Sequence, residues 1–153
     1  MSTIPAEAQE HHRKGFQLLT ESAYQEARDQ FLTAIEKSPD WASPYLGVGQ
    51  TYFFQKKQDL DKATEAFLRV VELKPDWVEG YHWLGAVQQQ AGASEDAVKS
   101  YRTAIRIAPS DTRPLIALGV CLTEMGQYTE AVDSLRRAIT LRPPYALASA
   151  RSG

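Results

Sequence analysis

A motif that recurs four times is the feature that most restricts how this chain can fold. Its clearest element is a proline after an apolar segment, with spacings of 36, 34 and 34 residues: Pro39, Pro75, Pro109 and Pro143. An alanine stands twelve residues before each proline: Ala27, Ala63, Ala97 and Ala131. A large apolar or aromatic residue follows four residues after each alanine: Phe31, Phe67, Tyr101 and Leu135. Each copy also carries a glycine: Gly15, Gly49, Gly85 and Gly119. Such a period is typical of proteins whose repeating units stack side by side.

The copy at residues 78–111 shows the form of one unit. Its first segment has residues three or four apart that share one helix face: Tyr81, Leu84, Gly85 and Gln88. Its second segment has a similar face and stops before the proline: Ala97, Tyr101, Ala104 and Ile105. The pattern predicts two amphipathic helices folded as a hairpin, with the proline ending the second helix because it cannot continue the hydrogen-bond ladder. One hairpin cannot bury its apolar face alone, so we expect the copies to stack.

Two details of the repeat carry structural predictions. A glycine inside a helix costs about 1 kcal/mol relative to alanine, so four glycines at one position indicate helices too close for a β-carbon. The recurring alanines fit the same need for close packing. The second copy has two extra residues around Gln55–Gln58, which predicts a longer polar turn between its helices.

The pattern resembles the tetratricopeptide repeat, whose signature is Trp-x-x-Leu-Gly-x-x-Tyr, then Ala-x-x-x-Phe, then Pro. The third copy has Tyr81 in place of the tryptophan, and the first copy matches least well, with His11, Lys14, Gly15 and Leu18. The resemblance covers roughly residues 8–145. It implies an all-α, right-handed solenoid of four antiparallel hairpins with a concave inner face. We expect one domain over residues 1–153, with repeats at 8–41, 42–77, 78–111 and 112–145, a tail at 146–153, and a short helix at Tyr145–Ala150.

Composition excludes several classes of function. A net charge of −2 gives no overall attraction to nucleic acid or an anionic membrane, and the one cysteine, Cys121, allows no intrachain disulfide. No signal-peptide or membrane-spanning run is present, so we expect a cytoplasmic protein. The sequence has no motif of paired metal ligands and no glycine-rich phosphate loop. We therefore predict no catalysis, no metal and no cofactor.

The inner face is the best candidate for a binding site. In proteins with this repeat it comes from the first helix of each hairpin, on the side away from the glycine and leucine stripe. This mapping predicts a groove lined by His12, Phe16, Leu19, Leu46, Gln50, Phe53, His82, Trp83, Gln89, Ile116 and Val120. An aromatic and aliphatic concave surface suits a peptide or a helix of a partner protein. The alternative is that Phe16, Leu19 and Phe53 pack within the stack.

One subtype of the family is disfavoured. Repeat domains that hold the acidic C-termini of heat-shock chaperones use a clamp of lysine, asparagine and arginine on the inner helices. The sequence contains no asparagine, so a clamp of that type is not expected here.

Two further functions remain open. The spacing predicts that Cys121, Met125, Val132 and Ile139 face a missing fifth repeat, where a cap, the rest of a longer chain or a second copy of the protein would cover them. We favour the first two explanations over self-association. The chain could also be the regulatory repeat region of a larger protein or enzyme.

The charge is unevenly distributed along the chain. Residues 1–98 carry 9 Lys and Arg against 15 Asp and Glu, a net charge of −6, whereas residues 99–153 carry 8 against 4, a net charge of +4. The basic part could orient an acidic partner, although we favour solvated helix faces as the explanation.

Overall fold

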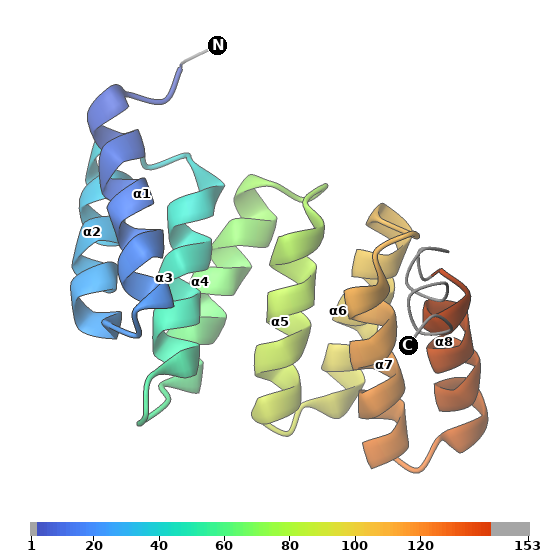
Figure 1. Ribbon diagram of the computed structural model, residues 1–153. Coiled ribbons are helices and arrows are strands. Elements are labelled where there is room, and N and C mark those ends of the chain that lie inside the picture. The colour runs from blue at the N-terminus through green and yellow to red at the C-terminus, as the bar shows by residue number, and fades with distance from the viewer. Residues whose placement is uncertain (1–2, 142–153) are drawn as a thin grey trace, which may run out of the picture.

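The computed structural model describes residues 3–141, in which eight α-helices and no strand are present (Figure 1). The helices are α1 (Ala6–Thr20), α2 (Tyr24–Lys37), α3 (Ala42–Phe54), α4 (Leu60–Leu73), α5 (Val78–Gln90), α6 (Ser94–Ile107), α7 (Thr112–Glu124) and α8 (Tyr128–Thr140). Consecutive pairs form four antiparallel hairpins, which confirms the predicted all-α solenoid. The short helix predicted at Tyr145–Ala150 and the tail at 146–153 lie outside the described residues.

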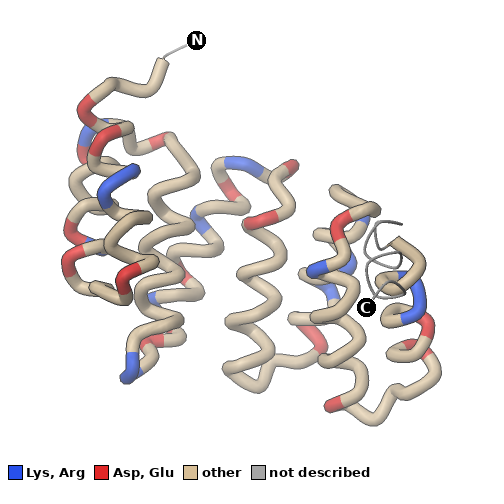
Figure 2. Tube along the Cα trace, in the orientation of Figure 1, with Lys and Arg blue, Asp and Glu red and all other residues tan. Residues whose placement is uncertain are grey.

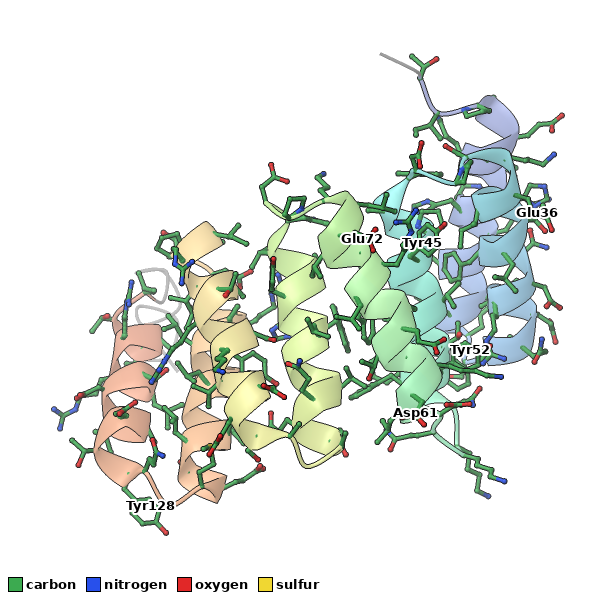
Figure 3. The ribbon with its side chains drawn as sticks, turned by 180° about the vertical axis from the view of Figure 1, so that it is seen from behind. Glu36, Tyr45, Tyr52, Asp61, Glu72 and Tyr128 are labelled. Carbon is green, nitrogen blue, oxygen red and sulfur yellow. The ribbon has the colours of Figure 1, made fainter. Side chains whose placement is uncertain are left out.

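The hairpins stack in two layers. The odd-numbered helices α1, α3, α5 and α7 contact one another in order, whereas each even-numbered helix contacts only its neighbours along the chain. The odd-numbered layer is therefore the inner, concave side, and the even-numbered helices spread apart on the convex side. Figure 1 shows the odd-numbered layer in front, and Figure 3 shows the even-numbered helices from behind.

The repeated glycines lie where the two helices of a hairpin meet. A β-carbon on Gly15 would lie 2.6 Å from the ring of Phe31, and one on Gly85 would lie 2.6 Å from the ring of Tyr101. Both rings are buried in the core. The prediction of a close approach is confirmed, and the group in contact is the large residue of the second helix.

The turns inside the hairpins use the left-handed backbone region. Ser22, Gly92 and Gly126 have φ values of 62°, 85° and 79° at equivalent positions. The second hairpin has a longer turn instead, as its two extra residues predict. There the Gln58 side chain donates to the Phe53 carbonyl at 2.8 Å, and the Asp59 N–H donates to the Tyr52 carbonyl at 3.1 Å.

The C-terminal face matches the prediction only in part. Val132 and Ile139 are 46% and 63% exposed, as expected for residues that face a missing repeat. Cys121 is fully buried and packs with Val98 and Leu122, so its predicted exposure is wrong. Its position in α7 faces the preceding repeat, as Val87 does in α5. Met125 is half-buried against the same cluster.

Candidate functional site: the inner groove

An aromatic patch lies on the inner layer where α3 meets α5. It consists of Phe53, Phe54 and Trp83, whose rings meet edge to face at centroid distances of 5.2, 5.8 and 5.4 Å. Phe54 is 45% exposed, whereas Phe53 and Trp83 are half-buried against the core. Aromatic pairs in this geometry add stability beyond the burial of their area, so the patch is both apolar and rigid.

Trp83 is held from several sides. Its ring stacks on the buried Phe67 at 6.1 Å with an interplanar angle of 25°, and its Nε1–H donates to Glu79 at 3.3 Å. Glu79 in turn forms an ion pair with Arg113 of the next repeat. A large aromatic surface in a fixed orientation is what a binding anchor needs, because little side-chain entropy is lost on binding.

A small charged cluster borders the patch. Arg113 also bonds to Asp111 at the start of α7, where Asp111 accepts from the Arg113 N–H at 3.0 Å. The guanidinium hydrogen bond is the main cause that lowers the pKa of Asp111, and the two carboxylates raise the pKa of Arg113. Two carboxylates share one guanidinium, so this cluster keeps a net negative charge at the side of the groove.

A second aromatic group lies between α1 and α3. The His12 ring stacks on Trp41 at 4.3 Å, and His12 Nε2 shares a hydrogen bond of 2.7 Å with the Ser43 hydroxyl. Phe16 meets the buried Phe31 edge to face at 4.8 Å, and Leu19 packs against the same cluster. Burial lowers the pKa of His12, which favours a neutral ring at pH 7.

The middle of the groove offers less surface than the sequence suggested. Leu46 is only 5% exposed and packs in the core with Phe67 and Leu84, so little of it is available for a ligand. Gln50 is 9% exposed, and its Oε1 is buried without a hydrogen-bond partner in residues 3–141. The close approach of α3 to its neighbours, which Gly47 and Gly49 permit, buries this part of the helix.

His82 is half-buried beside Trp83 and Tyr101, with ring centroids at 5.7 and 6.1 Å. Its Nδ1 also has no partner among the described side chains and backbone groups. Desolvation is the first cause that lowers the pKa of His82, and the charge of Arg113 adds to it. We expect a neutral imidazole at pH 7.

The C-terminal part of the groove is aliphatic. Ile116 and Val120 are 47% and 45% exposed on α7. Gln89 accepts from the Tyr101 hydroxyl at 2.8 Å and donates to Glu124 at 3.0 Å, so its amide is already engaged in the fold.

The sequence missed two of the aromatic residues in this face. Phe54 is the last residue of α3 and Trp41 directly precedes that helix, so neither lies inside the helical pattern used for the mapping. An aromatic residue at each boundary of the helix was the available signal. Within residues 3–141, no three His, Cys, Asp or Glu side chains gather as a metal site would require. No helix in that range is both long and apolar enough to cross a membrane.

Comparison with known proteins decides the family. A family model of the tetratricopeptide repeat matches residues 54–112 and 84–146. The chain belongs to the tetratricopeptide repeat family. A relative of this repeat protein is the peroxisomal targeting signal receptor of Eremothecium gossypii, 27% identical over 113 residues; these are 74% of this chain and 20% of the receptor. The chain thus spans about a fifth of that relative's length.

Solved repeat structures share the fold. The crystal structure of MamA has a TM-score of 0.79 at 20% identity, with 88% of this chain and 77% of that chain covered. The first TPR of Spaghetti (RPAP3), bound to the HSP90 peptide SRMEEVD, has a TM-score of 0.73 at 20% identity. The match covers 78% of this chain and 94% of that chain.

Proposed function

We propose that this tetratricopeptide repeat protein is a non-catalytic scaffold that binds a peptide or helical segment of a partner protein in its inner groove. The aromatic patch of Phe53, Phe54 and Trp83 carries the proposal. Exposed aromatic residues at the centre of a surface are enriched among those that dominate the free energy of protein association.

The structure suggests how such binding would work. A bulky apolar side chain of the partner would pack on Phe54 and on the accessible part of Trp83, and water would leave both surfaces. Phe53 and Phe67 support the two rings from behind, so the patch needs no rearrangement before binding. His12 and Phe16 on one side, and Ile116 and Val120 on the other, would extend the contact along the groove.

The names of two similar proteins support a peptide as the ligand class. One is a targeting signal receptor, and the other is a repeat domain in complex with an HSP90 peptide. We further propose that the protein is cytoplasmic, needs no cofactor and binds neither nucleic acid nor membrane.

Capture of partners from the native cell with paired variants tests the groove. Phe54→Asp places a charge in the aromatic patch, and Leu68→Asp places the same charge on a 47% exposed leucine of the convex helix α4. We expect Phe54→Asp to lose the partner and Leu68→Asp to retain it, with unchanged helicity in both. Equal retention by the two variants would reject the groove as the binding site.

A second candidate function is self-association through the C-terminal face. Val132 and Ile139 are exposed there beside a pocket of about 290 Å³ that α7 and α8 form. If the protein self-associates in this way, its average molar mass measured by light scattering should rise with protein concentration. In Val132→Glu the molar mass should return toward that of the monomer. A constant monomer mass at high concentration would exclude it.

A further inference from the structure

The convex side carries two clefts at equivalent places in the repeat. The first lies between α2 and α4 over α3, has a volume of about 400 Å³, and is lined by Leu32, Ile35, Tyr45, Val48, Tyr52, Lys62, Glu65, Ala66 and Arg69. Figure 3 shows Tyr45 and Tyr52 between α4 and α2. Leu32 at its edge is 44% exposed, so this cleft presents apolar surface to solvent.

The second cleft, between α6 and α8, is smaller than the first and is spanned by an ion pair. Its volume is about 270 Å³, and an ion pair of 2.8 Å between Arg102 and Glu130 joins its two walls. Arg102 lies seven residues before Pro109, and Glu130 lies thirteen residues before Pro143. The same two positions in the first cleft hold Leu32 and Lys62, which cannot form such a bridge.

The surroundings of the first cleft are acidic, and Figure 2 shows Asp and Glu residues in red along α2. Asp29, Glu36, Asp61 and Glu65 on α2 and α4 form no ion pair with any lysine or arginine of residues 3–141. Figure 3 shows Glu36 on α2 and Asp61 at one end of α4.

The cations near the first cleft are mostly committed elsewhere. Arg69 is paired with Glu72 at 2.8 Å. Arg28 is buried below the Tyr52 ring, 3.7 Å from its centroid. Within residues 3–141, Lys62 is the lining cation without an ion pair, and Glu65 is the lining carboxylate without one. The exposed Asp29, Glu36 and Asp61 add further negative charge on the same two helices.

We propose that the cleft between α2 and α4 is a second docking site, for a peptide segment in which a large apolar side chain is flanked by arginine or lysine. The apolar side chain would fill the space over Tyr45, Val48 and Tyr52. The flanking cations would meet the carboxylates of both helices, and partly desolvated charge pairs of this kind add affinity and orientation. This site is on the opposite side from the inner groove and does not depend on it.

Two synthetic peptides probe the site directly. One has a central phenylalanine with two arginines on each side, and the other has glutamates in place of the arginines; both have capped ends. We expect the basic peptide to bind at least about tenfold more tightly and to lose that advantage at high salt. Its addition should shift the ring resonances of Tyr45 and Tyr52.

A variant that places an ion pair across the first cleft is the decisive test. Leu32→Arg with Lys62→Glu recreates the bridge of the second cleft at two exposed positions. It makes the net charge one unit more negative, a change that by itself would favour the basic peptide. We expect this variant to bind the basic peptide at least about tenfold more weakly than the wild-type protein does. Phe54→Asp in the inner groove should leave the affinity for this peptide unchanged. Retained affinity in the bridged variant, equal binding of the acidic peptide, or resonance shifts confined to the inner groove would each overturn the proposal.

Discussion

The two ends of the solenoid differ at positions that the middle repeats bury fully or in part. On the α1 side, Glu10, Arg13 and Gln17 are exposed and hydrogen-bonded to one another. The same positions in the third repeat hold Gly80, Trp83 and Val87, which contact the repeat before.

The other end is apolar. Val132 is 46% exposed, whereas its equivalent Val98 is 7% exposed beneath the fourth repeat. Within residues 3–141, the first end thus presents polar side chains, whereas the second presents apolar side chains like those of an interior junction. A repeat position does not by itself decide whether a residue is core; the presence of a following repeat does.

The largest expected effect separates Val98 from Val132. Val98→Glu buries a carboxylate without a partner, so we expect it to lower the free energy of unfolding by about 3 kcal/mol or more. Val132→Glu leaves the charge in water and should cost less than about 1 kcal/mol. Urea denaturation followed by circular dichroism measures the free energy of unfolding of both variants. An equal decrease in the two variants would show that Val132 is covered in the folded protein.

The repeated glycines give the next contrast. Gly85→Ala pushes a methyl group into the ring of Tyr101, which is buried and bonded to Gln89, so we expect a loss of about 1–2 kcal/mol. Gly119→Ala meets Leu135 in the last hairpin, where the side chain has room to move. The gain in helix propensity, about 1 kcal/mol, should then offset the strain. If Gly85→Ala and Gly119→Ala lowered the thermal stability equally, the Leu135 side chain would have no more room to move than the Tyr101 ring.

These contrasts also show what the sequence could predict. Periodic prolines, alanines and glycines determine the hairpins and the close contacts, because each acts through backbone geometry within one repeat. The burial of Leu46 and Cys121 depends on how neighbouring hairpins approach each other, which spacing along one helix does not reveal. Phe54 and Trp41 were missed because helix boundaries, rather than helix faces, place them in the groove.

The turns differ between the first and third hairpins in a smaller way. Ser22 adopts a φ of 62°, which costs a side-chain-bearing residue roughly 1 kcal/mol. We expect Ser22→Gly to raise the free energy of unfolding by up to about 1 kcal/mol and Gly92→Ser to lower it by a similar amount. Denaturation midpoints that move in the same direction would argue against the left-handed turn.

The smallest effect concerns pH. Burial lowers the pKa of His82 below its usual value near 6.5. Near and below pH 6.5, His82 is therefore protonated to a greater extent in the unfolded chain than in the folded chain. Stability should therefore fall as the pH drops from about 7.5 to about 5.5, and less so in His82→Gln.

The equivalent position in the fourth repeat supplies the control for this pH effect. Ile116 is 47% exposed there, so a histidine introduced as Ile116→His should stay solvated and add no further loss of stability at low pH. Melting temperatures across this range provide the measurement. An unchanged pH dependence in His82→Gln would show that the burial of His82 is not linked to stability.

Site-specific photocrosslinking tests the central claim, that the aromatic patch of the inner groove contacts a partner. A benzophenone amino acid replaces Phe54 in one sample and the similarly exposed Leu68 in another, and both proteins are irradiated in the native cell extract. We predict a discrete crosslinked protein from position 54 that is absent from position 68 and is competed away by unlabelled wild-type protein. Crosslinks of equal yield from both positions, or from position 68 alone, would contradict the groove as the binding surface.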